Sequence, residues 1–201
     1  MAADRNELAA RIAATQAGDS IRGLFFNVLL HVAAARAGEA ARSRLQLEWR
    51  PDGYGDLRNY PVEEFLNLMY DIADLPVGPS ASGDAAAPDA AGVLYACGAS
   101  SVLHFAKGGP GQLVFGILGR ADPHRLFAQV GMAFSTVVSY GKRTYSPTGE
   151  KSGVLRFERD MQPPAYHRGI IEGALRALGT SGHVSPRVLG IDRVDYEVSW
   201  V

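Results

Sequence analysis

The feature that constrains this chain most is a change of hydrophobic period at Gly141. Before it, apolar residues recur every three or four positions, which is the spacing of buried helix faces. After it, apolar and polar residues alternate, which places one set of side chains on each face of a strand. The chain must therefore combine helices with a sheet, and the sheet must come from the last third.

Turn residues divide that last third into two hairpins around one helix. We expect strands at residues 143–145, 153–159, 184–189 and 193–200, with turns at 146–149 and 190–192. The helix between the hairpins begins after Asp160 and ends at Gly179. This pattern predicts an α+β fold with helices packed on one four-stranded antiparallel sheet, closed by a strand-strand-helix-strand-strand C-terminal unit.

The region before Gly141 is predicted to be helical. We expect helices at residues 21–37, 61–75, 93–107 and 122–141, the last bent by Gly131. Residues 112–118 fit a helix or a strand, and we expect a short helix. Residues 76–92 are rich in Pro, Gly and Ala and predict a mobile surface loop within a single domain of residues 1–201.

Charge and cysteine content exclude several classes of function. The 20 basic and 21 acidic residues give a net charge of -1, which disfavours nucleic-acid partners. The single cysteine, Cys97, indicates a reducing compartment, and we expect a cytoplasmic protein. No apolar run reaches the roughly 20 residues of a membrane span, so no membrane insertion is expected.

The histidines do not form a recognisable catalytic or metal-binding motif. His104 has the context of an axial haem ligand, but a lone histidine in an apolar helix is more often a core or boundary residue, and the same holds for His31. His167 lies near Glu158 and Asp160 in sequence, but no nucleophile accompanies them, so we expect helix capping.

The remaining candidates favour structural roles. Cys97 is expected to be a small buried hydrophobe, and Gly108-Gly-Pro-Gly111 a turn rather than a phosphate loop. The basic residues Arg120, Arg125, Lys142 and Arg143 are expected to belong to a solvated face. Since no nucleophile, acid/base pair or metal set emerges, we expect no enzyme activity.

The last helix and hairpin carry a resemblance to known proteins. The helix contains Gly169-Ile-Ile-Glu-Gly-Ala-Leu175 and precedes an alternating last strand. This resembles a superfamily of TRAPP subunits, vinyl-reductase-type sensors and haem nitric-oxide domains. Taken whole, the chain more closely resembles an uncharacterised paralogous family best known from myxobacteria, through segments such as Tyr60-Pro-Val-Glu-Glu-Phe-Leu66 and Pro163-Pro-Ala-Tyr-His-Arg-Gly169.

The resemblance implies a TRAPP-subunit-like or NO-signalling ligand-binding fold, with an apolar cavity between layers and dimerisation through helices. It also carries an expectation about cofactors. The haem domains pair a proximal histidine with a Tyr-x-Ser-x-Arg clamp, and that motif is absent from this sequence. We therefore expect no cofactor and disfavour haem.

Two functions follow from these observations. The first is a non-enzymatic cytosolic sensory domain that holds an apolar small molecule, with Leu103, Phe134, Gly169, Ile170 and Gly173 at its pocket. Gly169 and Gly173 lie four residues apart and would let another backbone approach closely. The alternative is a homodimeric scaffold, or an interaction module for a regulatory protein partner, without a bound ligand.

Overall fold

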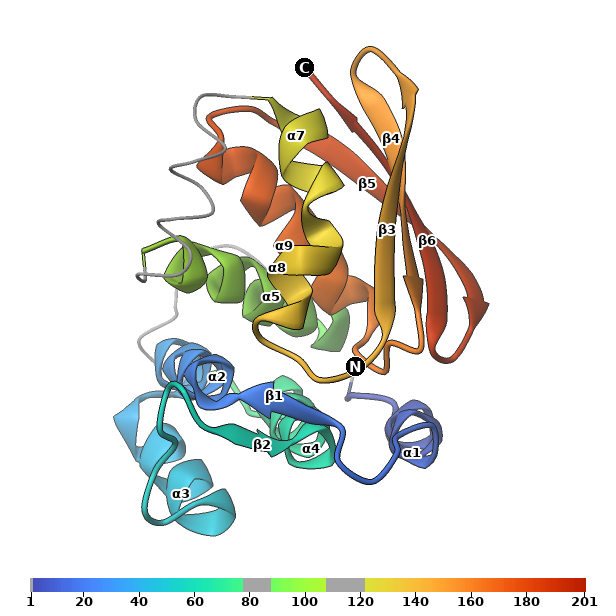
Figure 1. Ribbon diagram of the computed structural model, residues 1–201. Helices are drawn as coiled ribbons and strands as arrows, with labels where there is room; N and C mark the ends of the chain where they lie inside the picture. Colours follow the sequence, from blue (N-terminus) through green and yellow to red (C-terminus); the bar gives the residue numbers. More distant parts are fainter. Residues whose placement is uncertain (1, 78–87, 108–121) are drawn as a thin grey trace.

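A computed structural model describes residues 2–77, 88–107 and 122–201 (Figure 1). Its C-terminal unit is one antiparallel sheet in the order β3-β4-β6-β5. The strands are β3 (Lys142–Gly149), β4 (Ser152–Glu158), β5 (Gly182–Gly190) and β6 (Arg193–Trp200), and α9 (Pro164–Ala177) joins the two hairpins. The predicted α+β fold with a four-stranded antiparallel sheet is confirmed.

The turn of the first hairpin was predicted at the wrong place. Residues 146–149 belong to β3, where Pro147 pairs with Gly153, and the chain turns at Glu150 and Lys151. β3 lies at the edge of the sheet. An edge strand tolerates proline because the missing N–H can face away from the ladder.

The N-terminal half is a group of helices with a small ribbon. Its elements are α1 (Arg5–Ala13), β1 (Ser20–Arg22), α2 (Gly23–Ala37), α3 (Glu39–Trp49), β2 (Asn59–Pro61) and α4 (Val62–Ala73). α2 and α4 confirm two predicted helices. The first residues predicted for each helix belong instead to the strands β1 and β2. α1 and α3 were not predicted, because each buries few apolar side chains: Leu8 in α1 and Leu45 in α3.

The middle of the chain departs from the prediction at one helix. α5 (Ala90–Lys107) confirms the third predicted helix and begins three residues earlier than expected. The expected fourth helix is divided at Gln129 into α7 (Pro123–Ala128) and α8 (Val130–Ser135). The chain leaves the helix early because Val137 O accepts a hydrogen bond from Arg22 N, and Ser139 N donates to Ser20 O.

Four predictions fall wholly or largely outside the described residues. They are the loop at 76–92, of which residues 78–87 are not described, the short helix at 112–118, the turn at 108–111 and the solvated position of Arg120. Within the described part of the loop region, residues 90–92 form the first turn of α5.

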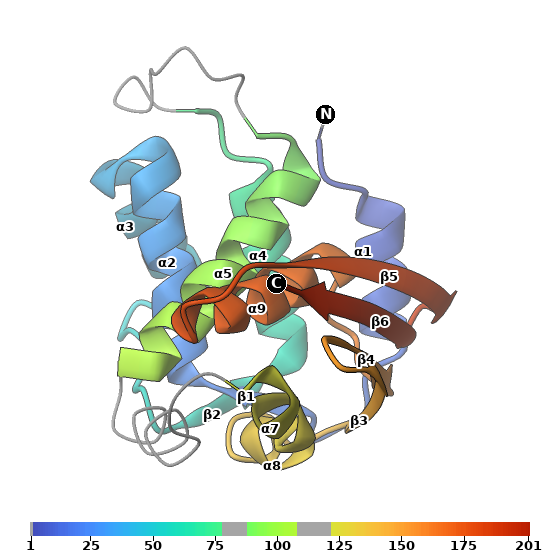
Figure 2. The ribbon, with the colours of Figure 1, turned by 90° about the horizontal axis from the view of Figure 1, so that it is seen from above.

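The layers stack in the order sheet, α9, α5 and then α2 with α4 (Figure 2). α9 covers the β5 and β6 half of the inner sheet face, and α7 with α8 covers β3 (Figure 1). One core lies among the N-terminal helices and α5, and a second lies between α9 and the sheet. In the described ranges, no helix has the length and apolar character needed to cross a membrane.

Glycines allow α5 and α9 to touch along their backbones. A Cβ on Gly169 would overlap the Tyr95 carbonyl oxygen and lie 2.8 Å from Ala99 N. A Cβ on Gly98 would in the same way overlap the Tyr166 carbonyl oxygen. The close approach predicted for Gly169 is therefore confirmed, and its partner is α5.

Candidate ligand-binding site

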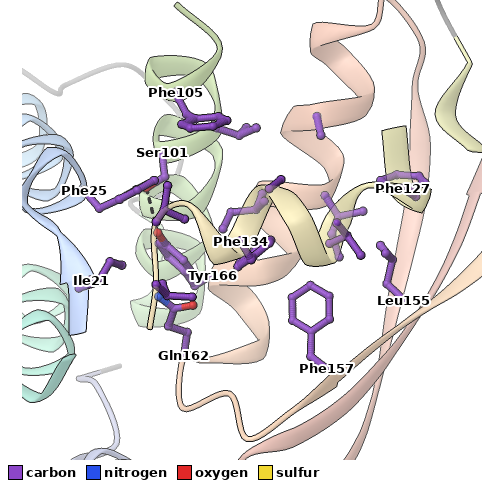
Figure 3. Close-up of a pocket in the computed structure, with 18 of the residues that line it drawn as sticks. Ile21, Phe25, Ser101, Phe105, Phe127, Phe134, Leu155, Phe157, Gln162 and Tyr166 are labelled. Carbon is purple, nitrogen blue, oxygen red and sulfur yellow. Dashed lines mark hydrogen bonds between the residues drawn. The ribbon is translucent and has the colours of Figure 1, made fainter. Parts of the chain in front are cut away.

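A cavity of about 110 Å³ lies where α5, α8, α9 and β4 meet (Figure 3). It is lined chiefly by apolar side chains: Ile21, Phe25, Val102, Phe105, Leu126, Phe127, Val130, Ala133, Phe134, Val137, Val138, Leu155, Phe157, Ile170, Ile171 and Ala174. A cavity of roughly 150 Å³ lined by such residues stays dry and takes up benzene. The described space is therefore of the size of one aromatic ring.

Local sequence explains how this wall forms. Ile170, Ile171 and Ala174 share the inner face of α9 because they lie at helical spacing. Leu155 and Phe157 both point inward from β4, since residues two apart share one face of a strand. Phe127 from α7 and Phe134 from α8 both line the same space, with Phe134 near its middle and Phe127 to one side (Figure 3).

Three polar side chains line the cavity. Two of them satisfy each other, since Tyr166 Oη donates to Ser101 Oγ at 3.0 Å and Ser101 Oγ donates to the Cys97 carbonyl at 2.8 Å. The third, Gln162, is 2% exposed, and its Oε1 atom has no hydrogen-bond partner among the described residues. Burial raises the pKa of Tyr166, so its phenol remains neutral.

A buried polar cluster of Arg143, Asp160 and His167 lies next to the cavity. Arg143 donates to Asp160 Oδ2 from Nε at 3.0 Å and from Nη2 at 2.5 Å. His167 Nε2 lies 3.0 Å from Asp160 Oδ1, which is an ion-pair distance, although the angle does not suit a hydrogen bond. This Arg143 cluster is shielded from water, because its three side chains are at most 3% exposed.

Aromatic rings separate the cluster from the cavity. The Arg143 guanidinium lies 4.7 Å from the centre of the Phe134 ring, and the His167 ring lies 4.7 Å from that of Phe157. Burial alone would raise the pKa of Asp160, but the neighbouring His167 and Arg143 side chains and the hydrogen bond from Gln162 N hold it below its ordinary value. Asp160 is therefore the buried anion of the cluster.

The predicted pocket residues separate into three groups. Phe134 and Ile170 line the cavity. Gly169 and Gly173 lie at the contact of α9 with α5 and are not in the described lining. Leu103 was placed wrongly: it is 41% exposed, because Val102 and Phe105 occupy the face of α5 that points toward the cavity.

Several residues were assigned the wrong surroundings by the sequence. Arg143 is buried rather than solvated, and His167 pairs with Asp160 instead of capping a helix. His31 and His104, which were predicted to be core or boundary residues, are exposed, with ring centres 5.4 Å apart. The prediction for Cys97 is confirmed, since it is fully buried.

Sequence reasoning missed Gln162, Tyr166 and the Arg143 cluster. Asp160 and Arg143 are 17 residues apart, and no local pattern relates them. A metal centre did not emerge either: among the described residues there is no group of three or more His, Cys, Asp or Glu side chains placed to hold an ion.

The family model for DUF2378, described as a protein of unknown function, matches residues 14–201. The chain belongs to this family. The predicted membership of an uncharacterised family is thus confirmed. No curated protein sequence matches the chain.

Solved H-NOX structures share the fold of this DUF2378 protein. The Fe(II)NO form of an H-NOX protein from S. oneidensis aligns with a TM-score of 0.67 at 15% identity, over 90% of this chain and 99% of the other. The unliganded Fe(II) protein from K. algicida aligns with a TM-score of 0.64 at 12% identity, over 90% and 97%. At these identities the likeness establishes the fold, and the predicted NO-signalling type of ligand-binding fold is confirmed.

The prediction that no cofactor is bound, with haem disfavoured, needs correction. The two matching structures above are Fe(II) proteins. A further matching structure comes from work on haem redox potential and porphyrin distortion. It aligns with a TM-score of 0.65 at 9% identity, over 89% of this chain and 99% of the other. The absence of one short motif was too weak an argument against haem, because a whole fold can be kept while such a motif changes.

The residues that line the cavity meet some of the requirements for binding haem. Its aromatic side chains suit the apolar surface of a porphyrin, and Tyr166 Oη is an atom that can ligate haem iron. The present volume of about 110 Å³ suits a single ring, so a porphyrin would need the walls of the cavity to move apart.

Proposed function

We propose that this protein is a sensory domain that binds an apolar small molecule in the cavity between α5, α8, α9 and β4. The observation that carries the proposal is an almost wholly apolar, aromatic-lined space inside a fold shared with H-NOX proteins. Close-packed protein interiors leave few voids larger than a water molecule. A retained space of this size supports ligand binding.

Sensing requires that the ligand bind one conformation better than another. α7 and α8 are the short elements of the cavity wall, and α8 has no fully buried residue. They are the part of the described wall that would adjust most easily. A non-enzymatic role and a cytoplasmic location belong to this proposal and remain predictions.

A cavity-filling variant tests the proposal. Ala174 lines the cavity on α9, and Ala177, three residues further along the same helix, is exposed. Ala174→Leu should abolish toluene binding by occupying the space, and Ala177→Leu should leave it unchanged. Two-dimensional NMR titration with toluene measures both. Equal binding by the two variants, or no binding by the unmodified protein, would reject the proposal.

Haem is the occupant suggested by the structural relatives, and it is tested separately. When bound, haem would supply an iron that takes up diatomic gases, while Tyr166 would be its ligand from the described lining. Titration with hemin should then give a stoichiometric Soret band that Tyr166→Phe shifts or removes. A spectrum that is the same for Tyr166→Phe would exclude that ligand.

The scaffold alternative has one supporting observation. Val188 and Leu189 are 60% and 42% exposed on β5, which is an edge strand of the sheet. Edge strands with apolar side chains favour pairing with another chain. Light scattering over a concentration range tests this alternative, and a strict monomer would contradict a homodimer formed through β5.

A further inference from the structure

The lining of the cavity contains one polar group that nothing in the described structure satisfies. Gln162 lines the cavity, and its buried Oε1 atom lacks a hydrogen-bond partner among the described residues. Leaving such an atom unpaired destabilises the folded protein, so buried polar groups are almost always paired. The other two polar side chains of the lining, Ser101 and Tyr166, are already hydrogen-bonded to each other.

The backbone of Gln162 is held firmly. Its N–H donates to Asp160 Oδ1 at 3.1 Å, and its carbonyl accepts from Arg11 Nη1 at 3.2 Å. The Asp160 carboxylate is in turn fixed by Arg143. This hydrogen-bonded loop places the Gln162 side chain beside Tyr166, on the side of the cavity where Ile21 lies (Figure 3).

The shape of the remaining wall defines the rest of a ligand. The rings of Phe25, Phe105, Phe127, Phe134 and Phe157 line the cavity. Aromatic rings pair best with another ring in edge-to-face or offset contact. The volume of about 110 Å³ corresponds to one ring.

From this arrangement we propose that Gln162 determines ligand specificity, and that the cavity takes a one-ring aromatic molecule carrying a single hydrogen-bond donor, an N–H or O–H, that donates to Gln162 Oε1. The inference rests on the proposed function, since it names the class of ligand for the same cavity. Ring burial would supply the affinity, and the amide would select for the donor.

Aniline and toluene are suitable probes, because they differ mainly in an amino group against a methyl group of similar size. Gln162→Leu removes the acceptor and keeps the backbone hydrogen bonds of the loop. We expect this variant to weaken aniline binding about tenfold, the worth of one hydrogen bond. Toluene binding should be unchanged or slightly tighter. Gln46→Leu, the same substitution on α3 far from the cavity, is the matched control.

NMR titration of the three proteins with both probes separates the outcomes. A loss confined to aniline and to Gln162→Leu supports the inference. If both probes bind and Gln162→Leu changes their affinities equally, Gln162 does not select the ligand, while the proposed function stands. If neither probe shifts the signals of cavity residues in the unmodified protein, both proposals fail. Circular dichroism of each variant checks that the fold is retained.

Discussion

Arg143, Asp160 and His167 place charge inside the molecule, behind the Phe134 and Phe157 rings. Asp160 is the central residue, since both other side chains meet its carboxylate. Removing one partner of a buried ion pair is costly, because it leaves the other charge without compensation. Asp160 also accepts the backbone N–H of Gln162, so it supports the loop beside the cavity.

Asp160→Asn should therefore lower the free energy of unfolding by roughly 3–5 kcal/mol at pH 7. Asp195→Asn is the matched control, because Asp195 is also buried but its partners Arg156 and Arg187 are more than half exposed and remain hydrated. We expect the control to lose about 1 kcal/mol. Urea unfolding measures both, and equal losses would contradict a special role for the Arg143 cluster.

The stability difference between the unmodified protein and Asp160→Asn should depend on pH. The pKa of Asp160 is lowered in the folded protein, so its contribution is complete above the unfolded pKa of about 4 and is lost as pH falls toward the folded value. The difference in free energy of unfolding between the unmodified protein and Asp160→Asn should then shrink between pH 5 and pH 3, which is roughly the range in which an unfolded aspartate takes up its proton. A constant difference across that range would show that the carboxylate is not the source of the stability.

Cys97 gives a second prediction for a single residue. Burial raises the pKa of its thiol to about 12, so the reactive thiolate is nearly absent in the folded protein at pH 8. Iodoacetamide should label Cys97 only after unfolding in urea, as followed by mass spectrometry. Rapid labelling without urea would mean that α5 opens readily.

At the scale of elements, the contact of α5 with α9 organises the fold and one side of the cavity. The two helices approach so closely because Gly98 and Gly169 each face the backbone of the other helix. Gly173 differs, since a Cβ there would lie 2.5 Å from Val102 Cγ1, a side-chain atom with more freedom to move.

Gly169→Ala should consequently destabilise the protein by about 1–3 kcal/mol, because the new methyl group forces two backbones apart. Gly173→Ala on the same helix should cost much less, since alanine also favours the helix by about 1 kcal/mol. Thermal unfolding of the two variants compares them directly. A larger loss for Gly173→Ala would show that side-chain packing, and not the backbone contact, limits the approach.

For the whole molecule, the Arg11 side chain links α1 to the C-terminal unit. Arg11 Nη1 donates to the carbonyl oxygens of Met161, Gln162 and Ile191 at 2.9–3.2 Å. α1 lies before the residues matched by the family model. A helix outside that match thus satisfies backbone acceptors of the loop that presents Gln162.

Arg11→Met should lower the free energy of unfolding by roughly 2–4 kcal/mol, because buried carbonyl groups lose their donor. Arg5→Met, also in α1, should cost less than about 1 kcal/mol, because the ion pairs of Arg5 with Asp71 and Asp74 are partly exposed. Hydrogen exchange should show faster exchange around residues 160–162 only in Arg11→Met. Similar effects of both variants would point to α1 docking as a whole rather than to Arg11.

The sequence alone determined the elements whose residues carry a strong period. The alternation after Gly141 specified four strands, and the apolar spacing of α2, α4, α5 and α9 specified those helices, because local burial patterns follow the period of the element. It also predicted the close approach at Gly169 and placed Phe134 and Ile170 near one another.

Tertiary structure decided what depends on residues far apart in the chain. It ended the helical region at α8 through backbone hydrogen bonds of Val137 and Ser139 to β1, buried Arg143 against Asp160, and exposed Leu103 by turning Val102 and Phe105 inward. It also brought Gln162, Tyr166 and Phe157 around one cavity. Charge pairing and cavity formation depend on distances in space, and no local period in the sequence encodes them.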